Sequence, residues 1–417
     1  MNLKFDDSRG RLFFPVKHNN YNFTECTVSV SKKNVFRGIH VNNFDKLVTC
    51  VNGRILDIII NLNEKENDYL VPQYYELNPE TELFEIFIKK NYGHAFLSLE
   101  ENSVLVYHFN GSYTNDDTKH IHYLDPFINI KIPINNPTLS EKDNLKNFIK
   151  PIDYVVFGST GFLGSNIIRH LEIEKKNFIK CALRLHETEQ ISNYFDIYKP
   201  KYVINCAGIT GTPNIFWCDD HRVETIENNI TYQLTMAKIC KDKNIHLTIF
   251  SSGGIFKNDK FYTENDEGNF KNNFYSEARI YLENIVKNYD NVLYLRINYP
   301  LSYAKSNKNL LTKILTYENI EDVELTLTYI DNLFPILFKM IENNEKGICN
   351  FVNPGVIKLS DILNLYNTFK KHNFKITKLN SGDRSLSLLE TDKLNLYNPI
   401  SIFDAINECV KKYTMND

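Results

Sequence analysis

A glycine-rich turn in the second half of the chain has residue types and spacing suited to binding a phosphate group. Gly158, Gly161 and Gly164 stand between an apolar run of strand length and a helical pattern. Glycines let the backbone turn tightly and approach a pyrophosphate, which the amide dipoles at a helix N-terminus favour. The pattern predicts a dinucleotide-binding turn. The residues expected to contact the cofactor there are Gly158, Ser159, Thr160, Gly161, Phe162, Leu163 and Gly164.

The end of the next expected strand bears on which dinucleotide binds. An acidic residue about 20 residues after the glycines would bind the ribose 2′-hydroxyl of NAD, but this chain has Arg184. A guanidinium can pair with a 2′-phosphate, so we expect NADPH. NADH is the alternative if Arg184 is only a solvated surface cation. A third strand should run into Cys206, Ala207 and Gly208, whose small size lets the backbone approach a bound ribose.

A serine and a tyrosine could reduce a carbonyl group beside that cofactor. Ser252 stands at the end of an expected strand, and Tyr275 follows 23 residues later on an expected helix. Ser252 would hold the substrate oxygen, and Tyr275 would protonate it as hydride arrives. Arg279, one helical turn after Tyr275, supplies a cation on the same helix face.

Two regions with different periodicity must position these groups. Before residue 138, strand-length runs rich in Val, Ile and Phe are separated by turn signals such as Asn52-Gly53, which is typical of an all-β sandwich or barrel. After Pro151, strands and helices alternate, which predicts a doubly wound parallel sheet. We expect a first domain over 1–137, a linker over 138–151 and a second domain over 152–417.

Composition excludes several classes of protein. The 417 residues exceed one ordinary domain, and 42% hydrophobic with 24% charged residues is the balance of a globular chain. The net charge of −3 gives no signature of nucleic-acid binding. No apolar run approaches the roughly 18 residues that span a bilayer, and no apolar signal region stands at the N-terminus, so we expect a cytoplasmic protein. The eight cysteines include no C-x-x-C pair, which favours reduced thiols and no structural metal.

The second half resembles the extended short-chain dehydrogenase/reductases, specifically the reductases of nucleotide-rhamnose synthesis, with the greatest likeness to plant epimerase-reductases. The matching stretches are Phe157–Gly164, Val203–Asn214, Trp217–His221, Glu224 with Thr225 and Asn229, Phe274–Ser276 and Asn350–Val356. The resemblance implies a Rossmann-type fold, reduction of a nucleotide-linked 4-keto sugar with NADPH, and substrate contacts from Thr210, Asn214 and Trp217.

Two residues depart from the pattern of that reductase family. Arg279 stands where the family has Lys. Arg keeps the positive charge but cannot pass a proton, so a proton relay through the ribose is not expected, while reduction should survive. Gly254 stands where the plant enzymes have Cys, and a Gly donates no proton. We therefore expect the second domain to have lost any epimerase activity.

The first half resembles dTDP-4-dehydrorhamnose 3,5-epimerase, a cupin jelly roll, over roughly residues 3–145. The matching stretches are Phe36–His40, Lys46–Gly53 with Asp57, Tyr92–Phe96, Tyr107 with Tyr113, Leu124–Pro126 and Leu139–Asp143. The C3 and C5 protons of a 4-keto sugar are acidified by the carbonyl. Epimerisation therefore needs a base on one face of the sugar and an acid on the other.

The resemblance to the epimerases assigns a role to each chemical group of this half. It implies that His40 is the base, oriented by the carboxylate of Asp125, and that Tyr113 is the acid. It also implies that Lys46 and His94 stabilise the enolate oxygen. Ligand binding is implied for Arg9 and Arg37. Metal binding by the two histidines is disfavoured, because no third His or Glu stands at ligand spacing. Glu25 and Thr27 replace family residues that contact the nucleotide and sugar, which leaves the nucleotide base and the C2 substituent open.

Together these interpretations predict a fused two-step enzyme, with a cupin jelly roll before a Rossmann-type reductase. The cupin would epimerise C3 and C5 of a nucleotide-linked 4-keto-6-deoxyhexose, and the reductase would deliver hydride from NADPH to C4. The product would be a nucleotide 6-deoxy-L-hexose such as UDP-L-rhamnose, with UDP favoured over dTDP. The alternatives are a 2-acetamido-2,6-dideoxy substrate, an active reductase with an inactive cupin dimerisation domain, and a non-catalytic nucleotide-sugar sensor. The cupin resemblance also implies a homodimer.

Overall fold

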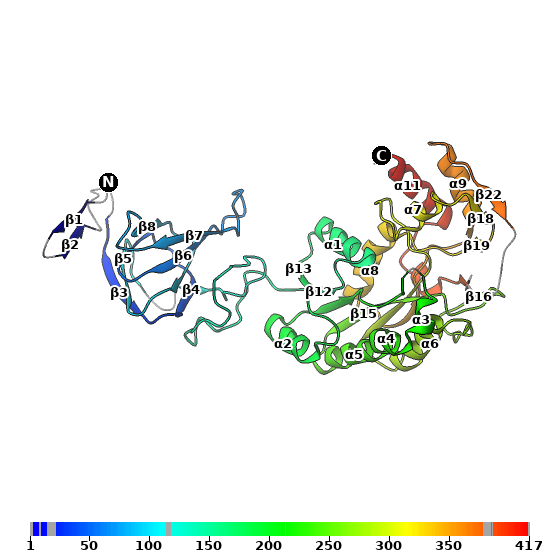
Figure 1. Ribbon diagram of the computed structural model, residues 1–417, viewed down its shortest axis with the longest axis horizontal. Coiled ribbons are helices and arrows are strands. Elements are labelled where there is room, and N and C mark those ends of the chain that lie inside the picture. Colours follow the sequence, from blue (N-terminus) through cyan, green and yellow to red (C-terminus); the bar gives the residue numbers. More distant parts are fainter. Residues whose placement is uncertain are drawn as a thin grey trace. The chain divides into compact units, whose positions relative to one another are not determined.

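The computed structural model of the chain describes residues 3–7, 10–14, 22–113, 118–212, 214–377, 385 and 387–415. The chain divides into two compact units, Met1–Pro151 and Ile152–Asp417 (Figure 1). Each unit has its own sheets and its own core, so each is described by itself.

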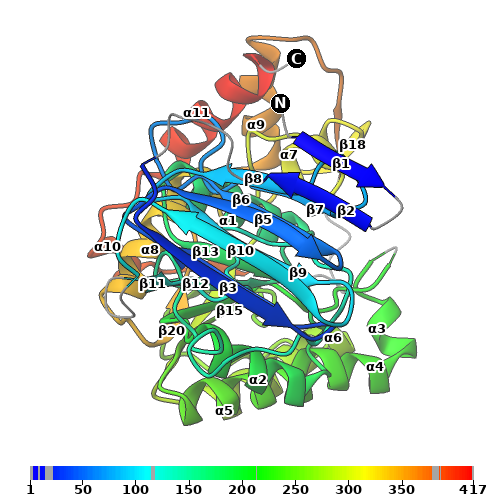
Figure 2. The same cartoon turned by 90° about the vertical axis from the view of Figure 1, so that its left-hand side faces the viewer.

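The first unit is built on two antiparallel sheets, seen from the side of the first sheet in Figure 2. The first sheet consists, in spatial order, of β3 (Glu25–Ser31), β10 (Ser103–Phe109), β5 (Lys46–Asn52) and β8 (Glu85–Ile88). The second consists of β11 (Lys119–His120), β4 (Phe36–Val41), β9 (Gly93–Ser98), β6 (Ile55–Ile60) and β7 (Pro72–Leu77). A separate antiparallel pair is formed by β1 (Leu3–Asp7) and β2 (Gly10–Phe14). The expected cupin architecture is confirmed.

The second sheet of this unit is buried on both faces. Phe96 of β9 shares a core with Leu105 of the first sheet, and Ile58 of β6 packs on the other face with Ile128 from the segment after β11. Burial on two faces explains why β6 reads as an almost continuous apolar run rather than as alternating apolar and polar residues.

The segment expected to be a linker belongs to the first unit. The Phe36 N–H donates to the Thr138 carbonyl at 3.0 Å, and the His122 N–H donates to the Asn147 carbonyl at 2.7 Å. Leu139 and Ile149 pack against the core of the second sheet. The polar composition of residues 138–150 led to the linker interpretation, although its few apolar side chains are enough to attach it to the sheet.

The second unit contains a six-stranded sheet in which every neighbouring pair is parallel. Its strands, in spatial order, are β13 (Phe178–Cys181), β12 (Tyr154–Phe157), β14 (Tyr202–Asn205), β15 (His246–Ser252), β17 (Val292–Ile297) and β20 (Gly347–Asn350). This order confirms the expected doubly wound, Rossmann-type fold.

Helices cover both faces of this parallel sheet (Figure 1). One face carries α1 (Phe162–Ile173) and α8 (Ile330–Glu342), whose apolar sides share one core with the strands. The other carries α2 (Thr188–Tyr198), α5 (Tyr232–Asp242) and α6 (Phe274–Val286). A further core holds α9 (Leu359–Asn367) against α11 (Ile402–Met415).

Short elements complete the second unit. The helices are α3 (Trp217–Asp220), α4 (Arg222–Ile226), the π-helix η1 (Glu227–Thr231), α7 (Leu310–Ile314) and α10 (Asp392–Asn395). The strands are β16 (Phe261–Tyr262), β18 (Asn319–Glu321), β19 (Glu324–Leu325), β21 (Ile357–Lys358), β22 (Lys375–Thr377) and β23 (Leu388–Leu389). Within the described residues, no helix is both long and apolar enough to cross a membrane. All eight cysteines are free thiols.

Candidate active sites of the two units

A local irregularity in β4 positions the first candidate base. Arg37 pairs with Phe96 of β9, and His40 pairs with His94, so β4 carries one extra residue between the two pairs. Gly38 occupies this bulge with a φ of +118°, and a Cβ atom there would lie 2.6 Å from the His94 carbonyl oxygen. A side chain is therefore excluded at this position, and the bulge brings His40 beside His94.

The partner of His40 is Asp143. Its Oδ1 lies 2.7 Å from His40 Nε2, and its Oδ2 accepts a hydrogen bond from Ser140 Oγ at 2.9 Å. The Asp143 side chain is only 4% exposed. Burial alone would raise the pKa of Asp143, but its hydrogen bonds with His40 and Ser140 hold that pKa below the usual value. The carboxylate therefore stays charged and fixes the orientation of the imidazole.

The predicted pairing of His40 with Asp125 is wrong. The Asp125 carboxylate accepts backbone N–H groups from Phe127 at 2.9 Å, Ile128 at 3.2 Å and Ile149 at 2.6 Å. It therefore joins the turn after β11 to the end of the unit and has a structural role. The sequence carried the correct signal in the stretch that ends at Asp143, which was recognised as part of the epimerase pattern but given no role.

Lys46, His94 and Asp57 form a second, more deeply buried group. His94 Nε2 lies 2.8 Å from Asp57 Oδ2, and both side chains are at most 4% exposed. Lys46 Nζ donates to Asn42 Oδ1 at 2.9 Å. Burial lowers the pKa of Lys46 to about 8, against the opposing charge of Asp57. Burial likewise lowers the pKa of His94, with Asp57 opposing the shift. Sequence reasoning assigned no role to Asn42 or to Asp57, whose partner His94 comes from another strand.

The remaining candidates of the first unit lie nearer the surface. Tyr113 is 47% exposed, and its ring centroid lies 6.4 Å from that of Phe109. Tyr107, by contrast, has its ring 6.3 Å from His94. Arg37 is held by β3, where its Nε donates to Ser31 Oγ at 3.1 Å. The predicted residue Arg9 lies outside the residues whose side chains are described.

A second histidine lies beside the His40–Asp143 pair. His120 on β11 is directly opposite His40 on β4, with 4.7 Å between their ring centroids. Its Nδ1 lies 3.5 Å from Asp143 Oδ1. One donor atom from each of these three residues lies within 4.8 Å of the others. The expectation against metal binding concerned His40 with His94 and rested on sequence spacing. The fold instead brings His120 and Asp143, from distant segments, beside His40.

In the second unit, the glycine-rich turn has the shape that a pyrophosphate requires. Gly158 follows β12 with a φ of +66°, and a Cβ on Gly164 would lie 2.1 Å from the Gly158 carbonyl oxygen. The N-cap of α1 is Gly161, which places no side chain on the first amides of the helix. Those amides are directed to the turn, so the residues present fit the phosphates of a dinucleotide.

Contacts between a turn and a helix join the end of β15, which carries Ser252, to the start of α6, which carries Tyr275. Ser252 ends β15 and its Oγ accepts the Gly254 N–H at 3.0 Å. Ser276, next to Tyr275 in the first turn of α6, donates its hydroxyl to the Gly254 carbonyl at 2.6 Å. Asn273 caps α6 by accepting the Ser276 N–H at 2.9 Å. These bonds place the end of β15 against the start of α6.

Arg279 is buried and only partly hydrogen-bonded. Arg279 is 4% exposed. Its guanidinium carbon lies 5.2 Å from the centroid of the Tyr275 ring, and its Nη2 lies 3.4 Å from Asn229 Oδ1. Among the described residues, Nε and Nη1 have no hydrogen-bond partner. A Cβ on Gly208 would lie 3.2 Å from Nη2, so the guanidinium adjoins the turn expected to contact a ribose. Its free donors suit the hydroxyls of that sugar.

The expected substrate contacts lie in the segment after β14 and at the start of α3. Trp217 begins α3 and stacks on His221 with 3.8 Å between ring centroids, while Thr210 and Asn214 are exposed nearby in sequence. Asp219 of α3 accepts the Phe274 N–H at 2.6 Å, which ties this segment to the start of α6. Arg184 is exposed after β13, where its side chain is free to meet a phosphate.

Comparison with known proteins agrees with this division. A family model described as dTDP-4-dehydrorhamnose 3,5-epimerase matches residues 4–150, and one described as RmlD substrate binding domain matches residues 153–332. The dTDP-4-dehydrorhamnose 3,5-epimerase of Shigella flexneri is 30% identical over 139 residues, which are 32% of this chain and 76% of that protein.

Further relatives extend the likeness. The bifunctional dTDP-4-dehydrorhamnose 3,5-epimerase/dTDP-4-dehydrorhamnose reductase of Arabidopsis thaliana is 35% identical over 226 residues, 52% of this chain and 75% of that protein. Longer trifunctional Arabidopsis relatives are covered over only 35% to 39% of their length. The crystal structure of a UDP-rhamnose synthase from Acanthamoeba polyphaga mimivirus matches with a TM-score of 0.60 and 29% identity, covering 63% of this chain and all of that one. The chain therefore belongs to the family of bifunctional dTDP-4-dehydrorhamnose 3,5-epimerase/reductases.

Proposed function

We propose that the chain converts a UDP-linked 4-keto-6-deoxyhexose to UDP-L-rhamnose in two steps. The first unit epimerises C3 and C5, and the second unit reduces C4 with NADPH. The observation that carries the proposal is the presence, in one chain, of His40 paired with the buried Asp143 and of Tyr275 beside Arg279, which adjoins the Gly208 turn. The first suits proton abstraction from carbon, and the second suits reduction of a carbonyl.

Proton abstraction is assigned to His40. Because Asp143 accepts the hydrogen bond at Nε2, the lone pair of a neutral His40 is on Nδ1. Nδ1 takes the proton from C5 or C3, and the electron pair of the broken C–H bond moves to the C4 oxygen as an enolate. Lys46, which lies close enough to His94 to affect its charge, offsets the developing negative charge. A proton from Tyr113 then returns to the opposite face of the carbon. The second centre repeats the sequence once His40 has released its proton to water and Tyr113 has taken one up from water.

Reduction is assigned to the second unit. NADPH, when bound, would supply the hydride that C4 of the sugar accepts. Ser252 hydrogen-bonds the C4 oxygen, and Tyr275 transfers its phenolic proton to that oxygen, so the carbonyl becomes a hydroxyl. Arg279 binds the ribose through Nε and Nη1 and stays charged, because a guanidinium does not give up a proton in a protein. The proton that Tyr275 loses must therefore be replaced by a route other than Arg279.

The choice of nucleotide rests on the relatives. The solved mimivirus protein is a UDP-rhamnose synthase, and the trifunctional plant relatives act on UDP sugars. The Arabidopsis bifunctional relative is named for dTDP sugars. We favour UDP because this chain covers the full length of the mimivirus protein. A 2-acetamido-2,6-dideoxy sugar is the second candidate, because Glu25 and Thr27 alter positions that contact the sugar in the epimerases.

Deuterium exchange tests the division of labour. Wild type, His40→Ala and Tyr275→Phe are incubated in heavy water with UDP-4-keto-6-deoxyglucose, without and with NADPH, and products are analysed by mass spectrometry. We expect wild type and Tyr275→Phe to incorporate deuterium at C3 and C5 without NADPH, and His40→Ala to incorporate none. Exchange by His40→Ala would assign both steps to the second unit. Reduction without exchange by wild type would make the cupin an inactive dimerisation domain.

The dTDP and 2-acetamido sugars are run as parallel substrates in the same assay. If either one reacts faster, it replaces UDP-4-keto-6-deoxyglucose as the assigned substrate.

We also expect a homodimer formed through the first unit. The edge strand β3 supports it, because Val28 and Val30 are each 58% exposed there and an unpaired strand edge invites pairing with a second copy. Light scattering during size-exclusion chromatography checks the mass.

A further inference from the structure

We propose that His40, His120 and Asp143 form a binding site for one divalent transition-metal ion such as Zn²⁺, and that metal binding there stops epimerisation. Metal binding itself follows from the geometry of the three side chains. Its effect on catalysis rests on the proposed role of His40 as the base.

The three side chains converge from segments that are far apart in the sequence. His40 and His120 face each other across the β4–β11 pairing, and their rings meet edge to face at 71°. Asp143 reaches both, since its Oδ1 lies 2.7 Å from His40 Nε2 and 3.5 Å from His120 Nδ1. All three donor atoms lie within 4.8 Å of one another. The second ring adds a nitrogen that the His40–Asp143 pair does not need for its own hydrogen bond.

The donor set is that of an accessible zinc site. Two imidazole nitrogens and one carboxylate oxygen are ligands that Zn²⁺ and related ions prefer, and three protein ligands leave a fourth position for water. His120 Nδ1 is buried and makes no hydrogen bond of good geometry among the described residues. An ion would use this nitrogen and would replace the proton that His40 and Asp143 now share.

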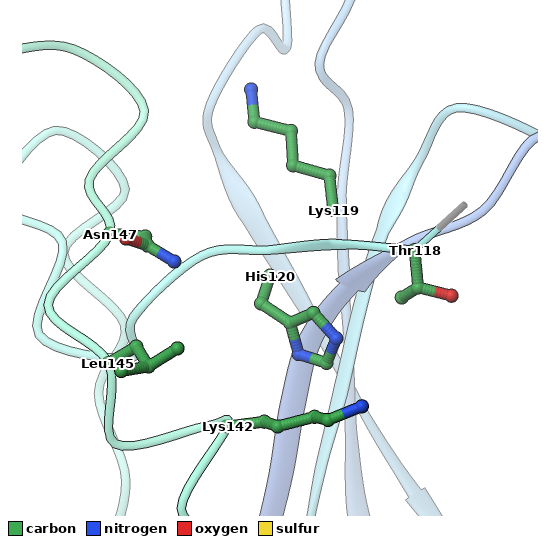
Figure 3. Close-up of a pocket in the computed structure, with 6 residues that line it drawn as sticks. All are labelled: Thr118, Lys119, His120, Lys142, Leu145 and Asn147. Carbon is green, nitrogen blue, oxygen red and sulfur yellow. The ribbon is translucent and has the colours of Figure 1, made fainter. Parts of the chain in front are cut away.

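A pocket beside His120 gives an ion a route to the site. It has a volume of about 420 Å³ and is lined by Thr118, Lys119, His120, Lys142, Leu145 and Asn147 (Figure 3). In Figure 3 the Lys119 side chain extends away from the imidazole, while Lys142 runs past it. The positive charge of Lys142 opposes a cation, so the site should bind metal reversibly rather than hold it permanently.

Metal binding would remove the base by changing its tautomer. Once Nε2 of His40 coordinates an ion, the ring proton of the neutral imidazole must sit on Nδ1. Nδ1 is the nitrogen that would otherwise take the proton from the sugar. The second unit is expected to keep its reductase activity, because none of the three ligands belongs to it.

Titration of the metal-free full chain with Co²⁺ tests the site directly, through the visible absorption of the bound ion. We expect wild type to bind one equivalent and His120→Asn to bind at least tenfold more weakly. His108→Asn is the matched control, because His108 is a partly buried histidine of the same unit on β10, with Phe23 as its aromatic neighbour. Equal Co²⁺ binding by all three proteins would overturn the proposal. His120→Gln replaces His120→Asn if thermal melting shows that the first variant does not fold.

Zn²⁺ in the deuterium-exchange assay tests the consequence. Exchange at C3 and C5 should stop in wild type and His108→Asn, return after a chelator is added, and persist in His120→Asn. Equal inhibition of His120→Asn would place the inhibitory ion elsewhere and refute the switch. A third outcome combines the two experiments. If Co²⁺ binding depends on His120 but the protein fails to exchange C3 and C5 even before metal is added, the metal site is confirmed and the proposed epimerase activity is refuted.

Discussion

The two candidate sites differ in how their charged groups are satisfied. In the first unit His40 and His94 each already have a buried carboxylate, with 2.7 Å between His40 and Asp143 and 2.8 Å between His94 and Asp57. In the second unit, Arg279 is buried while its Nε and Nη1 lack partners among the described residues. A base that removes protons from carbon needs its tautomer set before the substrate arrives. A reductase instead needs donors that are completed when the cofactor binds.

The largest expected effect is the loss of exchange in Asp143→Asn. The amide cannot hold His40 in the same tautomer or stabilise its protonated form. Deuterium exchange at C3 and C5 should fall about 10³- to 10⁴-fold, as when the carboxylate of a catalytic triad is replaced by its amide. Mass spectrometry of the sugar in heavy water measures the rate, and circular dichroism checks that the variant is folded.

Asp125→Asn is the matched control for that change. Because Asp125 accepts three backbone N–H groups, we expect a loss of about 1–3 kcal/mol in the free energy of unfolding, measured by urea denaturation. The folded variant should still exchange protons. A stable Asp125→Asn protein without exchange, beside an active Asp143→Asn protein, would restore the pairing predicted from sequence.

A smaller but still large effect is expected from Tyr275→Phe. Loss of the proton donor should slow NADPH oxidation about 10²- to 10⁴-fold, while exchange at C3 and C5 continues. Tyr281→Phe is the control on the same helix, since Tyr281 is 43% exposed and its hydroxyl donates to Glu277. Absorbance at the NADPH band follows the reaction. Loss of exchange in Tyr275→Phe would contradict the separation of the two steps.

Arg279→Met sharpens the comparison of the two sites. Removing a buried guanidinium, two of whose nitrogens have no partner in the described part of the chain, should raise the free energy of unfolding of the cofactor-free protein by about 1 kcal/mol. The same change should weaken NADPH binding about tenfold, which corresponds to about 1.4 kcal/mol. Denaturation with and without NADPH measures both quantities. A less stable protein with unchanged affinity for NADPH would show that the guanidinium serves the fold rather than the cofactor.

The smallest effect concerns the pH dependence of the first unit. Burial lowers the pKa of Lys46 from 10.5 to about 8. Between these values the unfolded chain binds more protons than the folded one, so this residue makes the protein more stable as pH rises through that window. Exchange should instead fall several-fold from about pH 7.5 to pH 9, because the enolate loses its cation. Lys46→Arg stays charged and should show neither trend. If the pH profiles of Lys46→Arg match those of wild type, Lys46 is not the cause of either trend.

Much of the fold was predicted from the sequence because its signals are local. The apolar run of β6 and the glycine turn before α1 depend on neighbours within a few residues, and both were placed correctly. The turn leaves no room for a side chain at Gly158 or Gly164, so the presence of glycine at these positions already indicates the turn. The two fold classes followed from the change in periodicity near Pro151. The boundary of the first unit was misplaced, because a polar segment can be held by a few side chains such as Leu139 and Ile149.

The sequence by itself determined which residue types are available for catalysis, including His40, His94, Lys46, Tyr275 and Arg279. Only the tertiary structure decided which carboxylate His40 contacts, since Asp143 lies 103 residues further along the chain. It also placed His120 against that pair and left two Arg279 donors without hydrogen-bond partners among the described residues. Local patterns depend on adjacent residues, whereas a hydrogen-bond partner depends on which distant segment packs over the sheet. The spacing of Asp125 and Asp143 in the sequence does not show which of the two contacts His40.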